Sequence, residues 1–167
     1  MNQPASDIRS RIWSRDEASD RAAALRAEGK KLVFTNGCFD LLHPGHVLYL
    51  EEAARLGDFL IVGVNTDASV QRLGKSPSRP IQHEEARALV IAALASVGAV
   101  VLFGEDTPRE LIAEVLPDVL VKGADYKPED IAGYDIVTAR GGRVATIPFV
   151  EGYSTTALER KIISAHR

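Results

Sequence analysis

Two histidines three residues apart, His43 and His46, are the strongest indication of chemistry in this sequence. They follow an apolar stretch and a small-residue turn, with Pro44 between them. Proline is tolerated in the first turn of a helix, where its missing N–H would have no partner anyway, so both histidines belong to a helix start. Residues at i and i+3 share one face of a helix. Because a helix N-terminus offers free N–H groups and the positive end of the dipole, the pair predicts a phosphate-binding site.

Three other segments carry groups that suit a phosphate. The stretch 74–80 is rich in Gly, Pro and Ser and carries two cations, one of them Lys75, which predicts a basic loop. Lys122 and Gly123 follow an apolar stretch, and three hydroxyl residues, 154–156, precede the last helical pattern. The chain has no G-x-x-x-x-G-K-[ST] and no G-x-G-x-x-G after its first predicted strand, which argues against P-loop and ordinary dinucleotide sites. These groups together predict a cradle for a polyphosphate.

No side chain in these segments is placed as an obvious nucleophile. The lone cysteine, Cys38, is interpreted as a small residue in a tight turn. This pattern favours direct in-line transfer of a nucleotidyl group to an acceptor that is already ionised, such as a phosphomonoester with a second pKa of about 6. Such a reaction needs positioning and electrostatic stabilisation more than a general base.

The elements that must position these groups alternate between short apolar stretches and helical patterns. Strands are expected at 32–34, 59–64, 99–103, 119–121 and 143–148. Helices are expected at 15–28, 46–56, 68–74, 83–97, 109–116, 134–140 and 157–167. This alternation predicts an α/β three-layer sandwich with a five-stranded parallel sheet. Because the polar clusters follow strands, they should line one cleft at the carboxyl ends of the strands.

Helix-capping patterns mark three of the expected helix starts. Ser14 and Glu17 have the spacing of a capping box, and so have Thr156 and Glu159. Asp67 is expected to cap the helix at 68–74.

Length and composition limit the possible function classes. The chain has 167 residues, 46% of them hydrophobic and 26% charged, which suits one domain with a real core. We expect a lead-in segment with a helix at 1–30 and the functional domain at 31–167. A net charge of −3 gives no general attraction to nucleic acid. No apolar run is long enough to span a bilayer and the N-terminus lacks a signal-peptide core, so we expect a cytoplasmic protein without nucleic-acid or membrane partners.

The sequence GCFDLLHPGH, Gly37 to His46, resembles the G-x-F-D-x-x-H-x-G-H signature of the cytidylyltransferase-like nucleotidyltransferases. Tyr153 to Thr156 resembles their second signature, a Ser-Thr-Thr run that opens the last helix. Over residues 32–163, the chain is most similar to the heptose 1-phosphate adenylyltransferases of ADP-heptose synthesis. The similar segments include VNTDASVQRLGKSPSRP, FGEDTP, LPDVLVKGADYKPEDIAG and GYSTT.

The resemblance implies a Rossmann-like nucleotidyltransferase fold and a specific reaction. AMP would pass from ATP to D-glycero-β-D-manno-heptose 1-phosphate, with Mg²⁺ accompanying ATP and held mainly by the triphosphate rather than by a protein metal site. Many relatives carry a fused sugar kinase, so a separate heptose kinase is expected to supply the acceptor. Relatives are commonly dimers, and the lead-in helix with Trp13 is a possible contact surface for a homo-oligomer.

The resemblance also implies roles for individual residues. The predicted catalytic residues stabilise charge on the transferring phosphoryl group and the leaving pyrophosphate, and they are His43, His46 and Lys75. The predicted nucleotide-binding residues are Asn36, Gly37, Cys38, Phe39, Lys122, Gly123, Ser154, Thr155 and Thr156. The predicted substrate-binding residues are Asp40, Asp67, Arg87 and Asp125.

Several alternatives stay open at the level of sequence. Arg72 or Arg79 can replace Lys75 as the cation that contacts phosphate, and Arg87 can be a structural or subunit-contact residue. A histidine pair can also bind a metal, although no third ligand of matching kind lies nearby and the chain has four histidines in all. The alternative functions are a cytidylyltransferase acting on glycerol 3-phosphate or a similar phosphomonoester, and a catalytically silent nucleotide-binding module.

Overall fold

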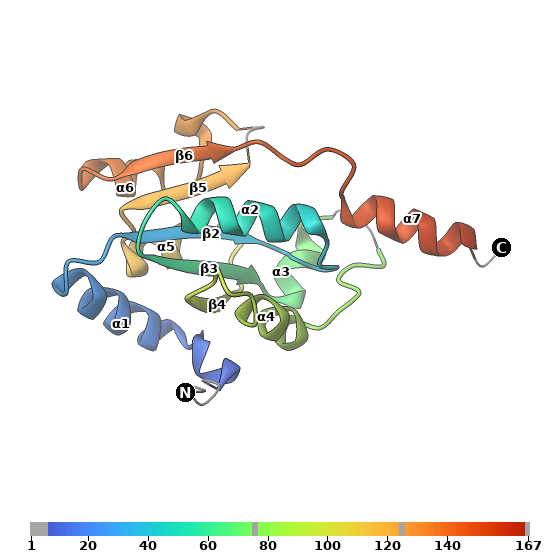
Figure 1. The fold of residues 1–167 in the computed structure, drawn as a ribbon, viewed down its shortest axis with the longest axis horizontal. Coiled ribbons are helices and arrows are strands. Elements are labelled where there is room, and N and C mark those ends of the chain that lie inside the picture. Colours follow the sequence, from blue (N-terminus) through green and yellow to red (C-terminus); the bar gives the residue numbers. More distant parts are fainter. Residues whose placement is uncertain (1–6, 75–76, 124–125, 166–167) are drawn as a thin grey trace, which may run out of the picture.

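The computed structural model in Figure 1 describes residues 7–74, 77–123 and 126–165. The strands are β1 (Ile12–Trp13), β2 (Leu32–Gly37), β3 (Phe59–Asn65), β4 (Ala99–Phe103), β5 (Val119–Gly123) and β6 (Arg143–Ile147). The α-helices are α1 (Arg15–Ala27), α2 (Pro44–Ala54), α3 (Asp67–Arg72), α4 (Glu84–Ala92), α5 (Arg109–Val115), α6 (Tyr134–Ala139) and α7 (Thr155–Ala165). Two 3₁₀ turns, η1 (Ile8–Arg11) and η2 (Pro128–Asp130), complete the described elements.

All six strands are parallel and lie in the order β1-β4-β3-β2-β5-β6. The chain adds β3 and β4 on one side of β2, and then β5 and β6 on the other side. The direction of strand addition therefore reverses beside β2, where Val33 pairs with Val119. In open parallel sheets this reversal opens a crevice at the carboxyl ends of the strands. The end of β2 and the end of β5 lie at that crevice.

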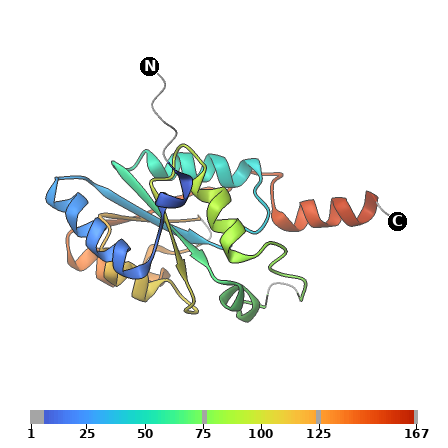
Figure 2. The same ribbon diagram turned by 90° about the horizontal axis from the view of Figure 1, so that it is seen from below.

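Helices cover both faces of the sheet, as expected for a three-layer sandwich (Figures 1 and 2). On one face, Phe34 belongs to a buried cluster with Leu111 of α5, and this cluster also includes residues of α1 and α6. On the other face, the next strand residue, Val33, clusters with Leu50 of α2 and with residues of α4. Strand residues alternate between the two clusters because successive side chains of a strand point to opposite faces.

The expected number of five strands is wrong, because β1 adds a sixth strand at the edge of the sheet. Ile12 pairs with Val100 and Trp13 pairs with Val101. Trp13 is only 7% exposed, and its ring stacks on Phe59 at a centroid distance of 5.6 Å. Trp13 lies in β1, before the helix α1, and its buried ring belongs to the core. A subunit contact through α1 stays a prediction. A strand of two residues has no recognisable periodicity, which is why the sequence pattern missed it.

Of the helix caps expected from the sequence, the one at Ser14 is confirmed. The capping box is present, since Ser14 accepts from the N–H of Glu17 and the Glu17 side chain accepts from the N–H of Ser14. The cap of α3 is Thr66 rather than Asp67, which is its first helical residue. Among the described residues, no helix has both the length and the apolar character that crossing a lipid bilayer requires.

Candidate functional site

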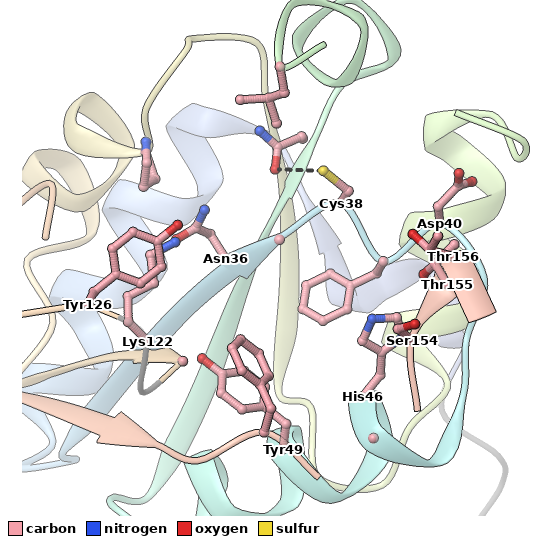
Figure 3. A pocket seen from close by; sticks show the side chains of 18 of the residues that line it. Asn36, Cys38, Asp40, His46, Tyr49, Lys122, Tyr126, Ser154, Thr155 and Thr156 are labelled. Atoms are coloured by element: carbon pink, nitrogen blue, oxygen red, sulfur yellow. Dashed lines mark hydrogen bonds between the residues drawn. The ribbon is translucent and has the colours of Figure 1, made fainter. Parts of the chain in front are cut away.

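A cavity of about 750 Å³ lies at the carboxyl ends of the strands. Its walls come from the turn after β2, the start of α2, the end of β5, the segment after β6 and the start of α7. Figure 3 shows Ser154, Thr155 and Thr156 beside His46, whereas Lys122 and Tyr126 lie on the opposite side with Asn36. The cavity therefore has a side with two helix N-termini and a side with a lysine and an aromatic ring.

The two histidines form a stacked pair at the start of α2. His43 is the N-cap, and its Nδ1 accepts a hydrogen bond of 3.3 Å from the backbone N–H of His46. The two rings stack with centroids 3.6 Å apart. A Cβ atom at Gly45 would lie 3.0 Å from Nδ1 of His43 and 3.1 Å from Cβ of Tyr153, so a small residue here permits this packing. Because Nδ1 of neutral His43 is an acceptor, its Nε2 carries the proton and is free to donate to a ligand.

Burial favours the neutral form of both imidazoles. Burial, followed by the proximity of His43, lowers the pKa of His46 from its ordinary value of 6.5 to about 4. Burial also lowers the pKa of His43. Nδ1 of His46 is buried and has no hydrogen-bond partner among the described residues. A phosphate in the cavity would favour the protonated rings, since a nearby anion stabilises the charged form.

The turn between β2 and α2 places Phe39 against His46. Phe39 has a φ of 48°, an uncommon conformation for a residue with a side chain, and its ring is buried edge-on to His46 at 5.2 Å. A Cβ atom at Gly37 would lie 3.0 Å from this ring. The side chain of Phe39 thus supports His46, and Gly37 and Cys38 of the same turn also line the cavity.

Asp40 anchors the segment that precedes α4. Its carboxylate accepts from the backbone N–H groups of Ile81, at 2.9 and 3.0 Å, and of Gln82, at 2.9 Å. Asp40 lines the cavity but is only 2% exposed. With its carboxylate occupied in this way, Asp40 fixes the loop rather than presenting a free charge to a substrate.

Arg87 is a buried support behind the same turn. It is 1% exposed and donates to the carbonyl of Cys38 at 2.7 Å, to the carbonyl of Gln82 at 2.9 Å and to the carboxylate of Asp67 at 2.8 Å. The other carboxylate oxygen of Asp67 lies 3.2 Å from Nδ1 of His83. Neither Arg87 nor Asp67 lines the cavity. The structure thus places these two predicted substrate-binding residues outside the cavity, where they connect three loops.

Arg79 is a cation of the basic loop that lines the cavity. Its guanidinium lies 3.2 Å from the hydroxyl of Thr156 and 3.2 Å from the carboxylate of Glu159, both on α7. Arg72, by contrast, pairs with Asp106 at 2.7 Å on the surface and does not line the cavity. The predicted residue Lys75 lies outside the described residues.

The start of α7 contributes the three hydroxyl residues. Ser154 caps the helix, since its Oγ accepts from the N–H of Ala157 at 3.0 Å. The expected capping box of Thr156 and Glu159 is therefore displaced by two residues, and Glu159 binds Arg79 instead. Ser154, Thr155 and Thr156 all line the cavity.

The opposite side of the cavity combines a cation with aromatic rings. Nζ of Lys122 lies 5.8 Å from the centre of the Tyr126 ring, a cation–π arrangement. Gly123 lies beneath the ring of Phe149, where any side chain at position 123 would collide with that ring. Asp125 lies outside the described residues.

Several cavity-lining residues were not identified from the sequence, among them Asn65, Tyr49, Asp106 and Asp130. Asn65, at the end of β3, is 4% exposed, and its amide donates to Ser69 Oγ at 2.9 Å. Tyr49 shares a hydrogen bond of 2.8 Å with the hydroxyl of Thr35, and burial raises the pKa of Tyr49 to about 12. Asn65 and Tyr49 could have been identified from the sequence. Asn65 lies at the end of a predicted buried strand, and Tyr49 is three residues beyond His46 on the same helix.

Comparisons with known proteins agree with this geometry. The family model described as Cytidylyltransferase-like matches residues 34–161. The chain is 59% identical over 151 residues to "Bifunctional protein HldE" of Aeromonas salmonicida (strain A449), covering 90% of this chain and 32% of that protein. It is 53% identical over 160 residues to "Bifunctional protein HldE" of Trichlorobacter lovleyi, covering 96% of this chain and 32% of that protein. The chain therefore spans about a third of the length of these curated relatives.

A solved structure also matches. It is described as the lipopolysaccharide core biosynthesis protein from Thermoplasma volcanium GSS1, with a TM-score of 0.60 and 30% sequence identity. The match covers 75% of this chain and 100% of that chain.

Proposed function

The chain belongs to the cytidylyltransferase-like family, and we propose that it transfers AMP from ATP to D-glycero-β-D-manno-heptose 1-phosphate, releasing ADP-heptose and pyrophosphate. The observation that carries this proposal is that His43, His46 and residues 154–156 all line the same cavity. Similarity to bifunctional HldE proteins and to a lipopolysaccharide core biosynthesis protein supports the choice of a heptose phosphate. The resemblance of residues 64–80 and 116–133 to heptose 1-phosphate adenylyltransferases supports it further.

In the proposed reaction, a phosphate oxygen of the sugar 1-phosphate attacks the α-phosphorus of ATP. The bond between the α-phosphorus and the bridging oxygen breaks, and pyrophosphate leaves with the bonding electrons. His43 and His46 donate to the phosphoryl oxygens, where the negative charge grows in the transition state. Ser154, Thr155 and Thr156 hold the β- and γ-phosphates at the N-terminus of α7.

The side of the cavity with Lys122 and Tyr126 is assigned to the remaining parts of the substrates. Asn36 carries a buried amide oxygen with no partner among the described residues, and a donor on the base or the ribose would satisfy it. The backbone at Gly37, Cys38 and Phe39 approaches the nucleotide from the end of β2. Lys75 and Asp125 keep their predicted roles as proposals.

Magnesium is proposed to enter with ATP. Within the described residues, no group of three or more His, Cys, Asp or Glu side chains is arranged to hold a metal ion, and Asp106 and Asp130 line the cavity as separate carboxylates. This donor set fits Mg²⁺, which is usually bound by substrate phosphates with one or two carboxylates and water. When bound, the ion would neutralise charge on the phosphates.

Release of pyrophosphate tests the proposal. The protein is incubated with Mg²⁺, each of the four nucleoside triphosphates in turn, and either heptose 1-phosphate or glycerol 3-phosphate. Release only with ATP and the heptose phosphate is the expected result. Release with CTP and glycerol 3-phosphate would agree with the family but would contradict the proposed substrates. Binding of ATP without release of pyrophosphate under any condition would indicate a catalytically silent nucleotide-binding module. The homo-oligomer, the cytoplasmic location and the separate heptose kinase stay predictions.

A further inference from the structure

A second, basic groove lies at the opposite end of the sheet from the cavity just described. It encloses about 550 Å³ and is lined by residues of the α1–β2 connection, the start of β5 and the α6–β6 connection. In Figure 1 this is the end where β2, β5 and β6 begin, far from α7. Because β2 has six residues, the groove and the cavity are separated by about 17 Å along the strand.

The groove is strongly basic in a chain whose net charge is −3. Its lining contains one carboxylate, Asp118, and five cations, which are Arg26, Lys30, Lys31, Arg140 and Arg143. The carboxylate is partly engaged, since Oδ2 of Asp118 accepts from the backbone N–H of Leu32 at 2.7 Å. The local charge is therefore opposite in sign to that of the whole molecule.

The position of one of these cations, Arg26, is explained by the capping of a helix. Arg26 donates to the carbonyls of Val115 and Leu116 at the end of α5, where the chain has unpaired carbonyl groups. Burial lowers the pKa of Arg26, the positive charge of Arg140 lowers it further, and the carboxylate of Asp118 acts in the opposite direction.

The other four cations have no such explanation. Among the described residues, no ion pair involves Lys30, Lys31, Arg140 or Arg143. Each of the four is exposed, so they repel one another at little cost in water but attract any anion that enters the groove. A single carboxylate cannot balance them.

From this arrangement we infer that the groove binds a multivalent phosphate anion of the pyrophosphate or nucleoside polyphosphate type. The cations converge from two connections, 26–31 and 140–143, so they can contact one compact anion from both sides. Gly29 and Gly141 also line the groove, and each has open space where a Cβ atom would lie, so the backbone is exposed there. Gly142 lines the groove too, but a Cβ atom at this position would lie 2.7 Å from the side chain of Val137. This site is distinct from the cavity at the carboxyl ends of the strands and does not depend on the proposed reaction.

Titration of the ¹⁵N-labelled protein with inorganic pyrophosphate tests the inference by NMR. The amide signals of Gly29, Gly141 and Gly142 should shift and saturate, independently of the signals of Gly37 and Gly123 in the cavity. The double variant Arg140→Glu/Arg143→Glu should lose the shifts at the three groove glycines and keep those in the cavity. The control variant Arg9→Glu/Arg55→Glu changes the net charge equally and should retain both sets.

The inference is overturned if the groove signals do not shift, if their shifts persist in the double variant, or if sodium chloride at equal ionic strength reproduces them. Shifts in the groove without shifts in the cavity would count against the proposed function and leave the groove site standing. Shifts confined to the cavity would overturn the groove site and leave the proposed function standing.

Discussion

The cavity contains two helix N-termini that are built in different ways. The start of α2 is part of the core, because Leu50 and Ala53 of this helix are fully buried against the sheet. The helix α7 has no buried residue among those described, and it projects from the body in both views (Figures 1 and 2). Its first turns are held by side-chain contacts such as those from Arg79 and Ser78 to Glu159.

This difference predicts different roles for the two helix N-termini at the site. In the proposed reaction, His43 and His46 at the start of α2 are held in place by the fold, which is the condition for electrostatic stabilisation of a transition state. An isolated helix of 11 residues is marginal in water, so the position of α7 depends on its few contacts and on the ligand. We therefore expect the α2 end to control the rate of the chemical step and the α7 end to control the affinity for ATP.

The largest effect should come from removing the buried support behind α2. Arg87→Ala leaves Asp67 without its guanidinium partner and the carbonyl of Cys38 without a donor, so we expect a loss of about 3–5 kcal/mol in the free energy of unfolding. Urea denaturation measures this loss. Arg72→Ala, which removes an exposed ion pair, should cost less than about 1 kcal/mol. Equal effects of the two variants would show that the α2 end is not fixed by Arg87.

Loss of a cavity histidine should lower the rate of the proposed nucleotidyl transfer. His46→Ala is expected to lower kcat by about 10²–10³-fold, or roughly 3 kcal/mol in the activation barrier, without unfolding the protein. Pyrophosphate release gives kcat, and circular dichroism checks the fold. His83→Ala is the control, since the His83 side chain is 94% exposed and outside the cavity. A normal kcat in His46→Ala would remove this residue from the proposed chemistry.

Acid should destabilise the protein through the same histidine. The pKa of His46 is lower in the folded chain, about 4, than its ordinary value of 6.5, so the unfolded state binds a proton that the folded state excludes. The contribution of the neutral, buried His46 to the free energy of unfolding is complete above pH 6.5 and is lost as the pH falls toward 4. The free energy of unfolding should therefore fall more steeply between these pH values in the wild type than in His46→Ala. Parallel curves would mean that His46 titrates normally in the folded protein.

The smallest effect is expected at the α7 end. Ser154→Ala removes the cap of α7, an interaction worth about 1 kcal/mol, and should raise KM for ATP several-fold with little change in kcat. Steady-state kinetics with ATP varied distinguishes the two parameters. Thr138→Ala, a hydroxyl deletion on α6 outside the cavity, is the matched control and should leave KM unchanged. A fall in kcat comparable to that of His46→Ala would show that both helix ends act alike.

The sequence by itself determined the features that depend on neighbouring residues. Helix starts at Ser14 and Pro44 follow from local capping and proline geometry, and the shared face of His43 and His46 follows from helical periodicity. The alternation of strands and helices also identified the edge of the sheet at which the cavity lies. Each of these inferences needs only a short window of the chain.

The tertiary structure alone decided which polar residues line the cavity and which support the fold. Asp40 and Arg87 were candidates for substrate contact, but each has a partner more than 40 residues away in the chain, at Ile81 for Asp40 and at Cys38 for Arg87. The strand β1 exists because two residues pair with β4, almost 90 residues further along. A buried charge needs a hydrogen-bonding or ionic partner, and an edge strand needs a partner strand that fixes its pairing register. Both partners come from chain segments that meet only after folding.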